Sequence, residues 1–310
     1  MEPYINFNRD RYRDRKRKIL KRILFFILFI FLVTIGIGIV VKNKKEVVVK
    51  NLEKGMFINI TDEISEPFNQ INWQEVAAVI ATQNKGDLSS VSESDVKNMS
   101  KKFIEIENSE SKLLSLDEIM DNLQFKDKEK EQTKKFISQI SKTYTTTGDT
   151  HKEFVNEIKV GAIETYKTYK ILPSITIAQA ILETGWGKSE LTTKANNYFG
   201  IKADKSWTGK KINMYTKEYN DKTIKDDFRQ YDNRIDSFKD HGKFLSINER
   251  YQKAGLFTSG HYIEQATALQ KAGYSTVEDE FGNKTYGKLL VDIIKDNNLM
   301  TIDNEAQRDE

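Results

Sequence analysis

A glutamate near the middle of the chain has the surroundings that acid catalysis needs. Glu183 ends an apolar stretch that follows Pro173, and the apolar residues recur at steps of four, which predicts a helix with one face in a core. Gly185 and Gly187 should stop this helix, so Glu183 should lie in its last turn. The helix dipole and apolar neighbours disfavour an ionised carboxylate there, and a carboxyl that stays protonated can act as a general acid. An exposed glutamate at a helix end is the alternative that these residues leave open.

The beginning of the same helix is also readable. Pro173 disfavours helix at the residue before it, and Ser174 can cap the helix that follows. Thr176, Gln179 and Glu183 then share one polar stripe beside the apolar face. The helix is therefore expected to hold the candidate acid at the edge between a core and a polar surface.

The elements around Glu183 predict an α-rich domain with one small β-hairpin. Four stretches have the apolar period of amphipathic helices: residues 151–170, 235–247, 261–272 and 286–297. Residues 212–219 and 223–231 are typical of two strands joined by a tight turn, with Glu218 near its tip. In the loop of residues 196–201, Gly200 permits a tight turn. A cleft between a helical body and a β lobe would suit a polymeric substrate.

Four motifs in this region carry a family resemblance. They are LPSITIAQAILETGWGKSEL, ANNYFGIKA, the hairpin with TKEY and FRQYD, and ALQKAGYST. Together they resemble glycoside hydrolase family 73, the peptidoglycan β-N-acetylglucosaminidases, whose fold is lysozyme-like. The resemblance covers roughly residues 150–299, and the presence of four motifs in the family's order makes it specific.

The resemblance implies catalytic roles for three residues. Glu183 matches the family's essential general acid, which would protonate the glycosidic oxygen between N-acetylglucosamine and N-acetylmuramic acid. Glu218 matches its second carboxylate, which would act as base on water or stabilise the oxocarbenium-like charge. Alternatively the substrate's own N-acetyl group could attack, an exception to the two-carboxylate scheme. Tyr274 matches a tyrosine that would orient that group, although it could also be a core residue.

Other residues in the region leave alternatives open. Tyr198 and Phe199 match the aromatic loop that lines the family's sugar subsites, but they could equally be packing residues. Trp186 could pack against a sugar or against the core. Because the hairpin is charged throughout, three further carboxylates compete with Glu218, namely Asp221, Asp226 and Asp227. The distances of these carboxylates from Glu183 do not follow from their sequence separation.

The composition narrows the possible partners. Among 310 residues, 49 Lys and Arg face 46 Asp and Glu, and the net charge of +3 gives no strong attraction to nucleic acid. The absence of cysteine excludes disulfides and thiolate zinc sites. The three histidines have no metal-ligand spacing. We therefore expect no metal, no cofactor and no nucleic-acid partner.

The N-terminal residues predict a membrane anchor. Residues 1–22 are strongly basic, and residues 23–41 are uncharged and nearly all apolar. At the helical rise, this apolar run spans roughly 28 Å, about one hydrocarbon core. The basic flank places the N-terminus in the cytoplasm and the rest of the chain outside the cell membrane. A cleaved signal peptide is the main alternative, although the run is longer than a usual signal core; a basic nucleic-acid-binding arm is a weaker one.

Between the anchor and the catalytic region we expect a spacer. Residues 42–70 are polar and mixed, typical of a linker or stalk. Residues 71–144 have helical periodicity, with Ser92 and Ser115 as candidate caps. Glu75 is expected to be a solvated helix residue. This helical module resembles, over a short stretch, a segment that precedes other membrane-anchored wall hydrolases, and it could be a spacer or bind a membrane-protein partner.

Two segments are expected to be irregular. Residues 145–150, TTTGDT, are typical of a domain boundary. Residues 300–310 are acidic and are predicted to be a disordered tail.

Taken together, the sequence predicts a mainly α protein with a transmembrane helix, a helical module and a lysozyme-like α+β catalytic domain. With its anchor, the chain resembles the membrane-bound glucosaminidases of Gram-positive bacteria. The expected function is hydrolysis of the β-1,4 bond after N-acetylglucosamine in peptidoglycan strands near the membrane. A muramidase or lytic transglycosylase on the same type of fold is one alternative, and a non-catalytic wall-binding scaffold is another.

Overall fold

The structure, a computed structural model, describes the chain from Val48 onward with short gaps. The described residues are 48–66, 69–107, 110–144, 148–218 and 222–308. Residues 1–22 and the predicted transmembrane segment 23–41 lie outside them. Among the described residues, no helix has the length and apolar character that a membrane crossing requires.

The first half of the described chain is mostly helical. Its elements are α2 (Lys54–Ser65), α3 (Trp73–Gln83), α4 (Glu93–Lys101), β1 (Ile104–Glu107), β2 (Glu110–Leu113), α5 (Leu116–Asn122) and α6 (Asp127–Tyr144). Ser92 and Ser115 form capping boxes with Asp95 and Glu118, as predicted. The antiparallel β1–β2 hairpin corrects the prediction of helical structure throughout residues 71–144.

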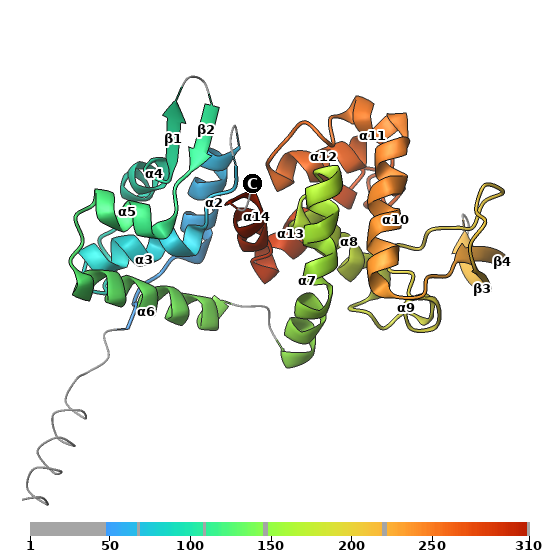
Figure 1. Ribbon diagram of the computed structural model, residues 1–310, viewed down its shortest axis with the longest axis horizontal. Helices are drawn as coiled ribbons and strands as arrows, with labels where there is room; N and C mark the ends of the chain where they lie inside the picture. Colours follow the sequence, from blue (N-terminus) through green and yellow to red (C-terminus); the bar gives the residue numbers. More distant parts are fainter. Residues whose placement is uncertain (1–47, 67–68, 108–109, 145–147, 219–221, 309–310) are drawn as a thin grey trace, which may run out of the picture. The chain divides into compact units, whose positions relative to one another are not determined.

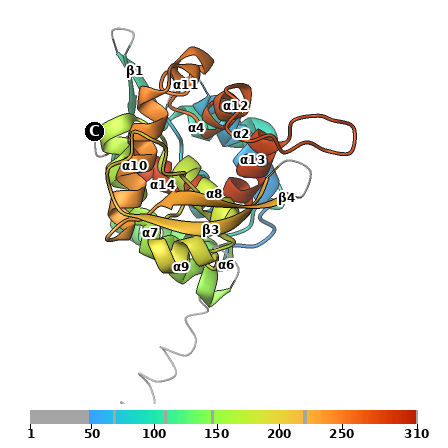
Figure 2. The ribbon, with the colours of Figure 1, turned by 90° about the vertical axis from the view of Figure 1, so that its right-hand side faces the viewer.

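The second half contains the predicted catalytic region. Its elements are α7 (Asp149–Tyr169), α8 (Pro173–Thr184), α9 (Glu190–Ala195), β3 (Lys211–Glu218), β4 (Lys222–Arg229), α10 (Arg234–Ile247), α11 (Glu249–Ala254), α12 (Tyr262–Lys271), α13 (Tyr286–Asn297) and α14 (Met300–Arg308). The prediction of a mainly helical fold with one hairpin in this region is confirmed. β3 and β4 pair antiparallel, and Figure 2 shows them side by side next to α9.

Helix α8 is the centre of the second half. It contacts α7, α12, α13 and α14 (Figure 1), and ten of its twelve residues are buried. Its core residues include Ile175, Ile177 and Ile181, and burial of such a side chain contributes about 1.5–3 kcal/mol relative to exposure. The helix that carries the candidate acid is therefore held on several sides.

Two segments predicted to be irregular are helices. Residues 42–70 were expected to be a linker, yet α2 buries Phe57 and Ile58 against the core. Residues 300–310 were expected to be disordered, yet α14 buries Met300 and Ala306. Both predictions were wrong because few apolar residues in each polar segment carry the packing, and their partners are distant in sequence.

The last helix also corrects the prediction for the start of α8. Ser174 does not cap this helix, because Leu172 is the N-cap and Pro173 is its first residue. Instead, the Ser174 backbone N–H and hydroxyl both donate to the carboxylate of Asp303, at 2.7 and 2.5 Å. A carboxylate of α14 thus takes the place of a local cap, where the helix dipole favours negative charge.

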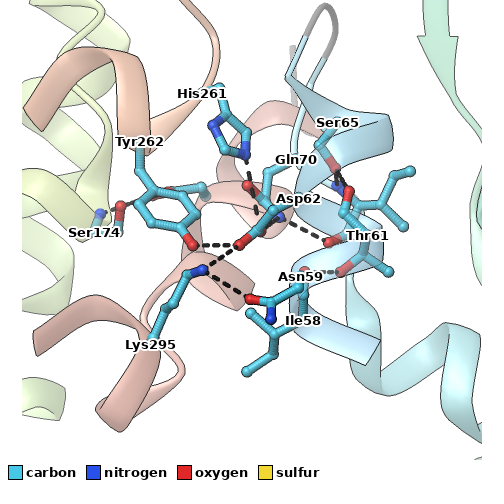
Figure 3. A network of polar contacts seen from close by, with 12 residues as sticks. Ile58, Asn59, Thr61, Asp62, Ser65, Gln70, Ser174, His261, Tyr262 and Lys295 are labelled. Carbon is cyan, nitrogen blue, oxygen red and sulfur yellow. Dashed lines mark hydrogen bonds and ion pairs between the residues drawn. The ribbon is translucent and has the colours of Figure 1, made fainter. Parts of the chain in front are cut away.

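A buried polar network joins α2 to the second half (Figure 3). The Asp62 carboxylate accepts hydrogen bonds from the Tyr262 hydroxyl at 2.6 Å and the Gln70 amide at 3.2 Å. The Lys295 ammonium lies 3.3 Å from it and also donates to Asn59. These contacts compensate for the burial of a carboxylate that is almost inaccessible to water.

A second polar contact fixes α14 to α3. Arg308 donates from both terminal nitrogens to the two oxygens of Glu75, at 2.9 and 2.8 Å, and also to the Leu114 carbonyl. Glu75 is thus not a solvated helix residue, as its sequence context suggested. Residues from Val48 to Glu310 accordingly form one compact unit.

Candidate active site

Glu183 lies in the last turn of α8, as predicted. The helix ends at Gly185, which adopts the left-handed conformation with φ of 57° and so permits the chain to turn sharply. Gly187 also has positive φ, and a Cβ there would meet the Phe154 ring at 2.6 Å. The two glycines thus allow the chain to leave α8 directly after Glu183 and pack closely against α7.

The Glu183 carboxyl is oriented by a tyrosine from α13. The Tyr286 hydroxyl donates to Glu183 Oε1 at 3.4 Å, and the Gln179 amide donates to the same hydroxyl at 3.1 Å. Gln179 and Tyr286 are both buried. Gln179 lies one turn before Glu183 on α8, on the polar stripe seen in the sequence. Tyr286 was missed, because it is 103 positions from Glu183 and only the fold brings the two together.

The environment of Glu183 favours the protonated acid. The Glu183 side chain is exposed at the end of α8, which is the alternative that the sequence left open, yet neighbouring protein atoms displace much of the water around its carboxyl. This loss of water raises the pKa of Glu183 above its usual value, and the hydrogen bond from Tyr286 opposes that rise. Burial is the larger effect. The direction of this pKa shift agrees with the one expected from the sequence, and its main cause is desolvation.

Two cavities meet at Glu183 and form a cleft. One, of about 480 Å³, is lined by Glu183 and by residues of α9 and the β3–β4 hairpin, including Leu191, Met214 and Tyr215. The other, of about 520 Å³, is lined by Glu183 and by Tyr251 and Tyr274. Phe199, Gly200 and Lys202 line both cavities. A chain of sugars could therefore cross Glu183 and be held on both sides of it.

The loop of residues 196–201 forms the wall between the two cavities. Asn197, which is buried, donates to the carbonyls of Ile201 and Arg229 and accepts from the Ile201 N–H. Gly200 adopts positive φ next to this bridge. The amide of one asparagine thus holds the loop closed and fixes it to the end of β4, with the Phe199 ring toward the cleft.

The structure brings Tyr274 to the same cleft. Its ring stacks on Tyr286 with centroids 5.3 Å apart and lies edge-on to His241. Burial raises the pKa of the Tyr274 hydroxyl well above its usual value, so it stays protonated. His241 is fully buried and stacks on Phe199, and its burial lowers the pKa to about 3. His241 is therefore a neutral core residue that supports both aromatic walls.

Two aromatic residues from the predicted site lie elsewhere. Tyr198 packs in the core between Phe154 and Phe238 and lines neither cavity. Trp186 stacks on His151 with centroids 3.7 Å apart and also lines neither of the two. Of the three aromatic candidates, Phe199 alone faces these cavities, whereas the positions of the other two favour the packing alternative.

The contacts within the hairpin reduce the number of candidates for the second carboxylate. Asp226 pairs with Lys202 at 2.8 Å, and Asp227 pairs with Lys211 at 2.5 Å. These contacts lower the pKa of both carboxyls, and neither residue lines the two cavities. The backbone of Glu218 pairs with Lys222 at the end of the hairpin, but its side chain is outside the description, as is Asp221. No group of three or more His, Asp or Glu residues in the described chain could hold a metal ion.

Comparison with known proteins identifies the region that holds this cleft. Residues 159–299 match the glucosaminidase family model, described as mannosyl-glycoprotein endo-beta-N-acetylglucosaminidase. This region is a glucosaminidase-family domain. It contains Glu183, Glu218 and Tyr274, and the match confirms the resemblance to this glycoside hydrolase family that four sequence motifs carry.

Individual relatives resemble the same part of the chain. The exo-glucosaminidase LytG of Bacillus subtilis is 42% identical over 138 residues, which cover 42% of this chain and 48% of that protein. The peptidoglycan hydrolase FlgJ of Vibrio parahaemolyticus is 40% identical over 134 residues, or 41% of this chain and 43% of that protein. The chain thus spans about half the length of these curated relatives. Among solved structures, the catalytic domain of the autolysin Auto from Listeria monocytogenes has 28% identity and a TM-score of 0.44, covering 62% of this chain and 99% of that one.

Proposed function

We propose that this protein is a peptidoglycan hydrolase that cleaves the β-1,4 bond between N-acetylglucosamine and N-acetylmuramic acid. The observation that carries the proposal is the Glu183 carboxyl, held at the junction of two cavities with its pKa raised by burial. The family match supports a glycosidase, and the curated relatives named as peptidoglycan hydrolases support the substrate.

In this proposal Glu183 is the general acid. Tyr286 donates to Oε1, so Oε2 is the oxygen that carries the acid proton into the cleft. As the bond between the sugar and the leaving oxygen breaks, Glu183 gives this proton to that oxygen, and positive charge develops on the sugar carbon. Gln179 and Tyr286 keep the carboxyl in place during the transfer because both are buried and fixed by packing.

The step that completes hydrolysis has two candidate routes. In the first, Glu218 on the hairpin would activate water or stabilise the positive charge on the sugar carbon. Otherwise the N-acetyl group of the substrate would attack, and Tyr274 would orient that group. The ion pairs of Asp226 and Asp227 with lysines argue against these two carboxylates as the base, since a paired carboxylate is a weaker base.

The proposed location follows from the N-terminal residues. Residues 23–41 would anchor the chain in the cell membrane with the N-terminus inside, and the cleft would then act on glycan strands outside and close to the membrane. The tether would restrict cleavage to nascent or membrane-proximal strands. Removal of residues 1–45 should change cellular glycan lengths, and unchanged lengths would mean that the tether has no such role.

Identification of the product ends tests the bond that is cleaved. Purified peptidoglycan would be digested with the full-length chain, the products reduced with borohydride, and the reduced sugar identified by mass spectrometry. Reduced N-acetylglucosamine would support the proposal. Reduced muramic acid or anhydromuramic products would assign the chain to the muramidases or lytic transglycosylases instead, and absence of cleavage would favour a binding scaffold.

A further inference from the structure

The cavity that contains Tyr274 is lined by three cationic side chains, and two of them are neutralised. Lys202 pairs with Asp226 at 2.8 Å. Arg229 pairs with Asp240 at 2.8 Å and lies 3.6 Å from Asp204. The third is Arg250, at the start of α11. Within the described chain, no carboxylate lies within ion-pair distance of Arg250.

Arg250 is nevertheless held in a defined position. One terminal nitrogen donates to the Tyr251 hydroxyl at 2.6 Å, and the other donates to the Gly273 carbonyl at 3.4 Å. The guanidinium also lies over the Tyr251 ring, 4.7 Å from its centroid. A guanidinium has five N–H donors, so three remain for a ligand. Gly273 immediately precedes Tyr274, so Arg250 lies beside the tyrosine assigned to the substrate's N-acetyl group.

This arrangement is suited to an anion. A neutral sugar offers hydroxyls and amides, for which a fixed and unpaired guanidinium is not required. A carboxylate, in contrast, takes two parallel hydrogen bonds from the guanidinium fork. Every muramic acid of a glycan strand has a lactyl group that ends in a carboxyl. This carboxyl is free in strands without peptides and is linked in others to a stem peptide with carboxylates of its own.

We propose that Arg250 binds a carboxylate of the muramyl branch and so selects acidic glycan strands over neutral ones. The inference rests on the proposed peptidoglycan substrate and adds a specificity residue to it. The two sources of the carboxylate, lactyl group and stem peptide, share one chemistry. The side of the cleft that holds Tyr274 would thereby recognise muramic acid, while the opposite side need not.

A binding measurement tests this without depending on cleavage. The full-length Glu183→Gln chain, in detergent, would be titrated with three glycan preparations: strands stripped of peptides, the same strands with their carboxyls converted to methylamides, and strands with intact stems. We expect the acid strands to bind about tenfold more tightly than the methylamide strands. Adding Arg250→Gln to this chain should remove the difference in affinity. Binding of the methylamide strands should stay within twofold of that of the Glu183→Gln chain.

The controls separate recognition from folding. Lys253→Gln, also on α11 but paired with Glu249, should leave the difference intact. Arg250→Lys keeps the charge without the fork and should retain part of it, which also serves if Arg250→Gln folds poorly. If Arg250→Gln weakens binding of the stripped strands, the carboxylate belongs to the lactyl group. If it weakens binding of the stemmed strands alone, the carboxylate belongs to the stem peptide. Equal weakening on all three preparations, or no weakening on any of them, would overturn the inference even if wild type cleaves the glycan.

Discussion

At the scale of single residues, the proposed site depends on the Glu183 carboxyl, whose pKa is raised by its surroundings. Glu183 could be chosen as a candidate acid from the sequence because its neighbours in the chain, an apolar helix and two glycines, also determine its environment. Tyr286 could not, since no local pattern distinguishes it from other buried tyrosines. Residues that act through a distant partner are found only when the fold has placed both.

Replacement of Tyr286 by Phe tests its positioning role. The hydroxyl stabilises the ionised Glu183 and so lowers its pKa; without it the pKa rises further. Because the acid must be protonated, the alkaline limb of kcat/KM should move to higher pH, while kcat falls about tenfold from looser positioning. Tyr144→Phe, which removes a hydrogen bond to Leu52 far from the cleft, should change neither. An unshifted alkaline limb would exclude the proposed contact.

Replacement of Glu183 by Gln should stabilise the protein at neutral and alkaline pH. A raised folded-state pKa means that the folded protein binds the proton more tightly than the unfolded chain, so stability falls as pH rises above the unfolded pKa. Because glutamine does not ionise, the substitution removes this loss of stability. Thermal unfolding at pH 8 should therefore show a higher Tm for Glu183→Gln, and the difference should shrink at pH 4. A lower Tm at pH 8 would contradict the desolvation of Glu183.

At the scale of elements, helix α8 is positioned from outside itself. Its period and its end were predicted, because apolar spacing and glycines act locally. Its beginning was predicted wrongly, because Ser174 is a good local cap and nothing in the sequence indicates that Asp303 replaces it. The same reason accounts for the missed helices α2 and α14, which gain stability from tertiary packing rather than from their own strong apolar period.

The Asp303 contact predicts a pH-dependent stability. Burial raises the pKa of Asp303 to about 7, although both donors of Ser174 oppose this. Between the usual carboxyl pKa and this value the folded state holds a proton that the unfolded chain has released, so stability falls as pH rises. Urea denaturation from pH 4 to 8 should show that this fall, on the order of 1–4 kcal/mol, is smaller in Asp303→Asn. Equal slopes in both proteins would refute it.

At the scale of the whole described unit, the segment before the catalytic domain is more than a spacer. The Asp62 network and the Glu75–Arg308 pair connect it to the second half through helices α2, α3 and α14. This connection could not be predicted from the sequence, because the paired residues are separated by about two hundred positions or more and each is unremarkable in its local context. The hairpin, by contrast, could be predicted because its two strand-like runs and the turn between them are adjacent in the sequence.

Disruption of the Glu75–Arg308 pair should weaken this unit. Both side chains are mostly buried, and removal of one partner leaves the other charge without compensation. Arg308→Ala should lower the free energy of unfolding by about 2–4 kcal/mol, measured by urea denaturation in a single transition. Lys97→Ala removes the exposed pair with Glu63 and should cost less than about 1 kcal/mol. Equal effects of the two variants would argue against a structural role for Arg308.

The central claim is that Glu183 supplies the proton for glycosidic cleavage. The most direct measurement is the rate at which reducing ends appear when purified peptidoglycan is treated with wild type, Glu183→Gln and, as a control, Glu164→Gln, which removes an exposed partner of Lys239. The account predicts a loss of at least about 100-fold for Glu183→Gln and a rate within twofold of wild type for Glu164→Gln. A Glu183→Gln chain that folds and keeps more than about a tenth of the activity would contradict the assignment.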